Sequence, residues 1–143
     1  MKIEEILRRK GHAVVTMEEG RTALDAARVL VEHGIGSVVI TREDVLAGIF
    51  TERDLLRLTA NDPGTLDSTT VGAAMTRSPV TAEPDDELTD MMGLMTERKI
   101  RHLPVVADGR VVGIVSIGDL LHACRSKAEE ENSHLRQYIQ GAV

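Results

Sequence analysis

The stretch Gly48–Asp54, GIFTERD, returns 65 residues later as Gly113–Asp119, GIVSIGD. Each copy runs from a glycine through two apolar residues and a hydroxyl residue to an aspartate. The same offset extends on both sides of this pair, and residues 15–56 align with residues 80–121 without a gap. Two unrelated segments would not keep one register over so many residues, so the chain is one supersecondary unit used twice.

Hydrophobic periodicity predicts the same order in both copies: a short strand, a helix, two strands and a second helix. The turn signals Arg42-Glu43-Asp44 and Asp108-Gly109 separate the paired strands. The predicted strands are residues 14–16, 37–40 and 45–50 in the first copy, and residues 80–81, 103–106 and 111–116 in the second. One such unit has too small a core to stand alone. We therefore expect an α/β (α+β) fold of two β-α-β-β-α halves, packed sheet to sheet about a pseudo-twofold axis.

Apolar residues at helical spacing mark the first helix of each copy. They are Ala23, Ala26, Ala27, Leu30 and Val31 in the first copy, and Leu88, Met91, Met92 and Met95 in the second. The second helices are expected to begin at Glu52 and Ile117. The chain then divides into a first repeat at residues 11–60, a linker at 61–70, a second repeat at 71–125 and a C-terminal helix at 127–140.

The two ends of the chain lie outside the repeat. Ile3, Ile6 and Leu7 give the N-terminal segment a weak helical stripe, which ends at Gly11. The C-terminal helix is polar apart from one side, which is formed by Leu135, Tyr138 and Ile139. Such a seam favours contact with a partner subunit over a place in the core.

Composition excludes several classes of function. The 143 residues carry a formal net charge of −6 and only two aromatic residues, which disfavours a nucleic-acid binder and a carbohydrate cleft. The apolar runs fall far short of the roughly 20 residues that span a bilayer, and the acidic N-terminus is unlike a secretory signal. The single cysteine, Cys124, excludes an intramolecular disulfide. We expect a soluble cytoplasmic protein.

The repeated motif has two interpretations. Thr51 with Asp54, and Ser116 with Asp119, have the spacing of capping boxes, in which the hydroxyl caps a helix and the acid sits in its first turn. The same geometry is a ligand site, because N–H groups at a helix start attract phosphate. An ionised aspartate there can accept both hydroxyls of a ribose diol. Capping does not account for the glycine in each copy, which we expect to leave an opening beside the strand end.

The duplicated unit, its two endings, Met75-Thr76 and the segment IRHLPVV at residues 100–106 resemble a tandem pair of cystathionine-β-synthase (CBS) domains, the Bateman module. The resemblance is greatest to small stand-alone bacterial proteins of this type. It implies a non-catalytic regulatory module that binds an adenosine ligand (AMP, ADP, ATP, NAD or S-adenosylmethionine) in two clefts between the repeats. It also implies a flat homodimer that a regulated protein partner would recognise.

The resemblance assigns residues to each cleft. The Asp54 cleft would combine Thr51 and Asp54 with Pro79, Val80, Arg101, His102 and Pro104, with Arg53 reaching across from the motif. The Asp119 cleft would combine Ser116 and Asp119 with Val14, Val15, Gly36, Ser37 and Val38. We expect the Asp54 cleft to hold the phosphate-bearing ligand, because it contains Arg101 and His102. The equivalent positions of the Asp119 cleft are Gly36 and Ser37, which carry no charge.

Two other functions remain as alternatives. An interaction protein with vestigial clefts would act through its terminal helices. An enzyme such as a nucleotide hydrolase would need paired carboxylates, a metal cluster or a nucleophile–base pair. The sequence shows none of these, and its five histidines lack metal-ligand spacing. We therefore predict neither an enzyme, a metal site nor a catalytic cofactor, and no membrane partner.

Overall fold

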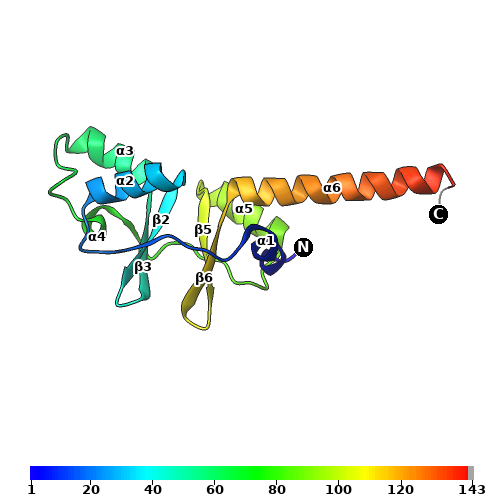
Figure 1. Cartoon of the computed structure of the whole chain (residues 1–143), viewed down its shortest axis with the longest axis horizontal. Coiled ribbons are helices and arrows are strands. Elements are labelled where there is room, and N and C mark those ends of the chain that lie inside the picture. Colours follow the sequence, from blue (N-terminus) through cyan, green and yellow to red (C-terminus); the bar gives the residue numbers. More distant parts are fainter. Residues whose placement is uncertain (142–143) are drawn as a thin grey trace.

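The computed structural model describes residues 1–141 of the chain. The first repeat contains β1 (Thr16–Glu18), α2 (Ala23–His33), β2 (Ser37–Arg42), β3 (Val45–Thr51) and α3 (Glu52–Asn61). The second contains α5 (Leu88–Arg98), β5 (His102–Ala107), β6 (Arg110–Ser116) and α6 (Ile117–Ile139). Three further elements precede or join the repeats, namely α1 (Ile3–Lys10), α4 (Val71–Ala74) and β4 (Thr76–Arg77). The helices of both halves lie on one side and the two hairpin turns point the opposite way (Figure 1).

The strand pairing repeats between the halves. In the first half, β1 is parallel to β2, and β3 is antiparallel to both β2 and β4. In the second half, β5 and β6 form an antiparallel pair with a parallel bridge from Ala82 to Val105. This bridge is the equivalent of the Met17–Ile40 pair 65 residues earlier. The predicted α+β fold class and both hairpins are confirmed.

Both hairpin turns use left-handed backbone. Glu43 and Asp44 have φ of 51° and 66°, and Asp108 and Gly109 have φ of 51° and 75°. Two successive residues with positive φ match the right-handed twist of the strands that they join. The turn signals in the sequence therefore place both hairpins correctly.

Three predictions about the elements are wrong. The first strand of the first repeat begins at Thr16 and not at residue 14, because its pairing with β2 is confined to Val39–Thr41. In the second repeat, residues 80–81 form no strand, and Ala82 makes a single bridge to Val105. The C-terminal helix is not separate, because residues 119–139 contain no Gly or Pro to interrupt α6. Val31 is 82% exposed and lies outside the buried stripe of α2.

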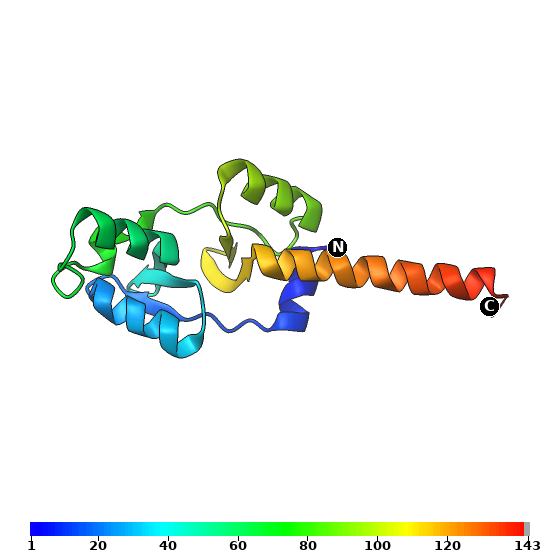
Figure 2. The ribbon, with the colours of Figure 1, turned by 90° about the horizontal axis from the view of Figure 1, so that it is seen from above.

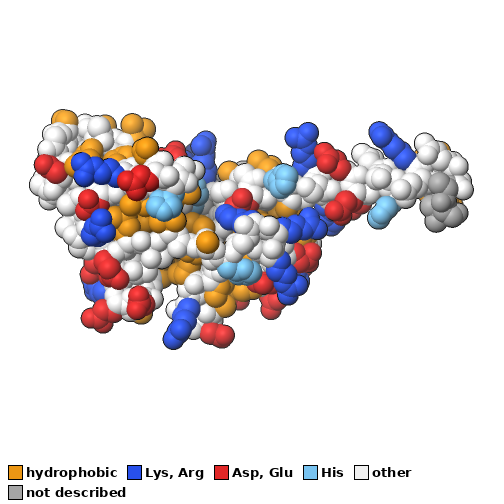
Figure 3. All heavy atoms as spheres, in the orientation of Figure 1, with side chains coloured by type: hydrophobic (Ala, Val, Ile, Leu, Met, Phe, Trp, Pro, Cys, Tyr) orange, Lys and Arg blue, Asp and Glu red, His pale blue; other side chains and the backbone are white. Residues whose placement is uncertain are grey.

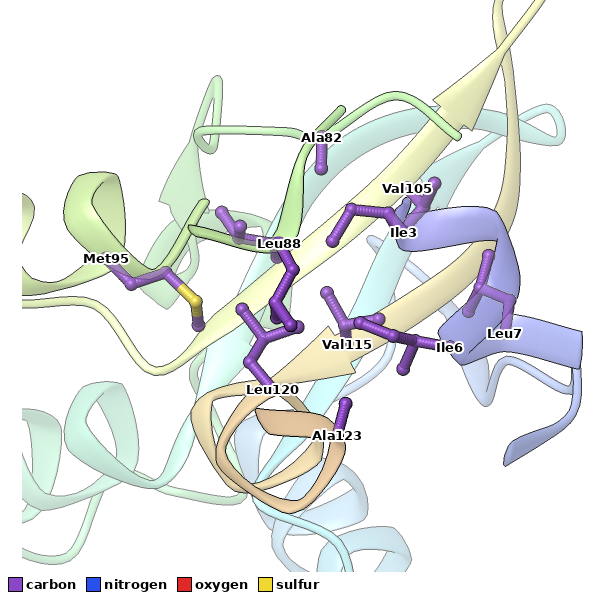
Figure 4. Packing of buried hydrophobic residues seen from close by; sticks show 11 residues of the cluster. Ile3, Ile6, Leu7, Ala82, Leu88, Met95, Val105, Val115, Leu120 and Ala123 are labelled. Atoms are coloured by element: carbon purple, nitrogen blue, oxygen red, sulfur yellow. The ribbon is translucent and has the colours of Figure 1, made fainter. Parts of the chain in front are cut away.

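Each repeat has its own core, and the segment that precedes each repeat packs on the other one. The second core contains Ile3, Ile6 and Leu7 of α1 together with Leu103, Val105, Val115 and Leu120, and Figure 4 shows Ile6 of α1 pointing toward Val115. Conversely, Val71 of α4 is buried in the first core. Each of these two segments therefore connects its own repeat to the other one.

The second half of α6 projects from the body. Seen from above, α6 passes between α1 and α5 and continues well beyond them (Figure 2). Leu135, Tyr138 and Ile139 near its end are exposed, and both acidic and basic side chains lie along the projecting part (Figure 3). Within residues 1–141, no helix combines the length and apolar character required to cross a membrane.

Candidate functional site

Both copies of the repeated motif end in a capping box. Thr51 Oγ1 accepts a hydrogen bond from the Asp54 N–H at 3.3 Å, and Asp54 Oδ2 accepts one from the Thr51 N–H at 2.9 Å. The equivalent distances between Ser116 and Asp119 are 3.1 and 2.8 Å. The capping interpretation is therefore correct at both helix starts. It does not exclude the ligand-site interpretation, because a cavity lies beside each box.

The motif glycines have a packing role that their sequence context does not reveal. A Cβ on Gly48 would lie 2.6 Å from both Met75 Sδ and the Thr76 carbonyl oxygen, and one on Gly113 would lie 2.6 Å from Leu7 Cδ2. Each glycine thus admits the segment that crosses over from the other repeat. The expected opening beside the strand end is filled in both copies.

The Asp54 cleft is a cavity of about 280 Å³ between the repeats. Its lining includes the predicted residues Thr51, Arg53, Asp54, Pro79, Val80, Arg101 and His102. The lining also includes Glu52, Arg57, Thr76 and Ser78, which sequence reasoning did not find. Arg53 reaches across the halves as expected, because its Nη1 donates to the Lys99 carbonyl at 2.9 Å. Three arginines, Arg53, Arg57 and Arg101, therefore line this cleft.

Asp54 itself is turned inward. Its side chain is 4% exposed, and Thr76 Oγ1 donates to its Oδ1 and Oδ2 at 3.1 and 3.3 Å. Together with the capping bond, these contacts engage both carboxylate oxygens. A ribose diol therefore reaches Asp54 only after the Thr76 hydroxyl has turned away.

The Asp119 cleft is a cavity of about 380 Å³. Its lining includes the predicted residues Val14, Val15, Gly36, Ser37, Ser116 and Asp119. It also includes Lys10, Ala13, Gly34, Ile35 and Ile114, which sequence reasoning did not find. Asp119 is 26% exposed, and its Oδ2 accepts a hydrogen bond from Lys10 Nζ at 2.6 Å. The expectation that this cleft lacks a cation is therefore wrong.

Two predicted lining residues face neither cleft. Val38 is fully buried in the first core. Pro104 is buried in β5, where it pairs with Ile114 and its carbonyl accepts the Ala82 N–H. Both lie one to two residues further into their strands than Ser37 and His102, which do line the cavities.

His102 and Gly36 form a wall that both clefts share. A Cβ on Gly36 would lie 3.0 Å from His102 Nε2 and 3.0 Å from Glu52 Oε1, so a side chain at position 36 would push into this wall. Burial lowers the pKa of His102, and the nearby Glu52 carboxylate offsets this only in part. The neutral form of the imidazole is therefore favoured between the two cavities.

Lys10 also affects the titration of its partner. Burial by itself raises the pKa of Asp119. The hydrogen bonds from Lys10 and from the Ser116 N–H together lower it by more, so the pKa of Asp119 lies below its ordinary value. Asp119 is consequently ionised at neutral pH. Among residues 1–141, no group of three or more His, Cys, Asp or Glu side chains could hold a metal ion.

The family model for the CBS domain matches residues 3–61 and 71–126. The chain belongs to the CBS-domain family. Among relatives of this family, the mitochondrial CBS domain-containing protein CBSX3 of Arabidopsis thaliana is 38% identical over 125 residues. The match covers 84% of this chain and 61% of CBSX3, so the chain spans less than two thirds of that relative.

Solved CBS-domain structures share the fold. The CBS-domain containing protein ATU1752 from Agrobacterium tumefaciens superposes with a TM-score of 0.83 at 38% identity, over 86% of this chain and 98% of that one. The CBS domain pair of MJ0100, in complex with 5′-methylthioadenosine and S-adenosyl-L-methionine, gives 0.79 at 29% identity, over 89% and 98%. PAE2072 from Pyrobaculum aerophilum, complexed with AMP, gives 0.74 at 28% identity, over 83% and 89%.

Proposed function

We propose that this CBS pair is a non-catalytic regulatory module that binds an adenosine-containing ligand (AMP, ATP, NAD or S-adenosylmethionine) between its repeats. The observation that carries the proposal is the pair of equivalent cavities, each beside an aspartate at the start of a helix. The complexes of MJ0100 and PAE2072 support it, because both are CBS structures of the same fold with adenosine ligands.

A ligand in either cleft contacts both halves of the module. The Asp119 cleft is lined by Val15 and Ser37 from the first repeat and by Ser116 from the second, and the Asp54 cleft is mixed in the same way. A ligand that fits one arrangement of the halves better than another shifts their equilibrium by its difference in affinity. A partner protein that recognises one arrangement would then respond to occupancy.

The assembly belongs to the same proposal. We infer a homodimer, with the exposed seam of Leu135, Tyr138 and Ile139 on α6 as one surface that a second subunit would cover. We also assign the module to the cytoplasm, on the evidence of its single free cysteine. Light scattering that gives 15.6 kDa in solution would contradict the homodimer.

Calorimetry tests the ligand-binding proposal directly. AMP, ATP, NAD and S-adenosylmethionine are each titrated into the full chain, and at least one should bind. The double variant Asp54→Asn with Asp119→Asn should weaken that binding by about 10–100-fold, because hydrogen bonds to a charged acceptor are lost. The control is Asp85→Asn with Asp108→Asn, which makes the same change of charge away from both clefts. Silence from all four ligands at millimolar concentration refutes the proposal.

The alternative is an interaction module whose clefts no longer bind ligand. The exposed apolar seam on the projecting part of α6 favours it, since such a surface is costly to leave in water. Under this alternative, capture of a protein partner is unchanged by the two aspartate substitutions and is lost when Leu135 and Ile139 are replaced by serine. If the module depends on ligand, capture of the partner should instead change when the two aspartates are replaced.

A further inference from the structure

The segments that precede the two repeats differ at two decisive positions. Extending the 65-residue register backwards aligns ILRRKG at residues 6–11 with VGAAMT at residues 71–76. Each segment lies against the motif glycine of a repeat, Leu7 beside Gly113 and Met75 beside Gly48. Lys10-Gly11 therefore has the same position relative to the Asp119 cleft as Met75-Thr76 has relative to the Asp54 cleft.

This difference leaves the two aspartates in different states. Thr76 closes Asp54 by donating its hydroxyl to both carboxylate oxygens. Gly11 has no hydroxyl to offer, and the bonds that Asp119 accepts from Lys10 and Ser116 both go to Oδ2. Within residues 1–141, Asp119 Oδ1 accepts no hydrogen bond. The partly exposed Asp119 thus has one oxygen free for a ribose hydroxyl, whereas both oxygens of the buried Asp54 are already engaged.

Lys10 is held in place by the packing of its helix. It is the last residue of α1, and Ile3, Ile6 and Leu7 of the same helix are buried in the second core. The Gly11 N–H donates to the Leu7 carbonyl at 2.7 Å, and the helix ends because the backbone of Gly11, with φ of 106°, is not helical. The Lys10 ammonium therefore enters the cavity from a fixed backbone, although its side chain remains 32% exposed and can turn.

An anion in this cleft would find two donors. The first is the Lys10 ammonium, which leaves Asp119 Oδ2 when a ribose diol takes both carboxylate oxygens. The second is the N–H of Gly118, the second residue of α6, which has no acceptor among residues 1–141. A phosphate at the start of α6 also benefits from the helix dipole. An uncharged ligand would break the Lys10–Asp119 pair and offer the ammonium no replacement.

We propose that the Asp119 cleft is the primary site for a nucleoside 5′-phosphate, and that Lys10 makes this cleft prefer a phosphate over an uncharged or cationic nucleoside. The inference rests on the proposed function and names the ligand class and the cleft that receives it. It reverses the expectation from the sequence that the Asp54 cleft holds the phosphate. The Lys10–Asp119 pair acts as the selecting contact, since only an anionic ligand compensates for its loss.

Calorimetry with AMP and adenosine separates the contributions of sugar and phosphate. Lys10→Met, which installs the residue found at the equivalent position 75, should weaken AMP binding by about tenfold or more, as expected for a charge-assisted contact. Adenosine affinity should stay equal or rise, so that the preference for AMP over adenosine collapses. The matched control is Arg9→Met, which removes a neighbouring exposed cation of α1 and should change neither affinity.

Conservative aspartate variants identify the cleft. Asp119→Asn should lower the affinity for AMP much more than Asp54→Asn does, and 2′-deoxy-AMP should bind the wild type about as weakly as AMP binds Asp119→Asn. If AMP binds the wild type and the loss follows Asp54→Asn while Lys10→Met is silent, the inference is overturned and the proposed function stands. If neither AMP nor adenosine binds the wild type, the inference fails, and failure of the other adenosine ligands as well removes the proposed function.

Discussion

Replacing Leu7 and Gly113, singly and together, tests how α1 is held on the second repeat. Leu7 is fully buried, and a Cβ on Gly113 would lie 2.6 Å from its Cδ2 and 2.8 Å from its Cδ1. Cβ atoms do not approach other carbon atoms so closely, so the two residues compete for one volume. Their effects on stability should therefore not add.

The magnitudes follow from burial and overlap. Leu7→Ala removes a buried side chain and should lower the free energy of unfolding by about 2–5 kcal/mol. Gly113→Ala overfills the same place and should cost about 1–3 kcal/mol. In the double variant the new methyl group enters the space that Leu7 vacates. The free energy of unfolding of the double variant should therefore be no lower than that of Leu7→Ala alone. The coupling energy is then at least about 1 kcal/mol.

Urea unfolding followed by far-UV circular dichroism measures these four free energies. The control is Gly93→Ala on α5, where a Cβ would meet nothing within 4 Å and the helix should gain about 0.5–1 kcal/mol. Losses from Leu7→Ala and Gly113→Ala that simply add in the double variant would refute the packing of α1 against β6.

Three further predictions concern the other repeat, the shared wall and the caps. Gly48→Ala should destabilise more than Gly113→Ala, because its Cβ meets the Thr76 backbone carbonyl as well as the movable Met75 side chain; thermal unfolding ranks the two variants. Because burial lowers the pKa of His102, the unfolded chain takes up a proton at this residue before the folded chain does. The folded state should therefore lose stability as the pH falls below the ordinary histidine pKa of 6.5, and this loss should be absent above it. The His102→Gln variant should show a flatter unfolding profile on the acid side. Ser116→Ala should cost about 1 kcal/mol by removing the α6 cap, measured by urea unfolding. The control is Ser126→Ala within the same helix, which should not lower stability because alanine is the better helix former.

Local patterns account for what could be predicted from the sequence. The hairpin turns at Glu43-Asp44 and Asp108-Gly109 and the caps at Thr51 and Ser116 depend on residues within four positions of one another. The duplicated register adds the pseudo-symmetry of the two halves. The same locality explains the misplaced first strand, because the length of a strand depends on its partner and not on its own apolar residues.

Patterns within the chain therefore suffice for the repeated unit, the class of fold, the family and the aspartate in the first turn of a helix in each half. The folded chain adds that α1 and α4 each pack on the other repeat, so that Lys10 reaches Asp119 across 109 residues while Thr76 covers Asp54. Both contacts depend on where a short buried helix docks. That docking depends on Gly48 and Gly113 admitting a neighbour from elsewhere in the chain, and no periodicity within a segment records it.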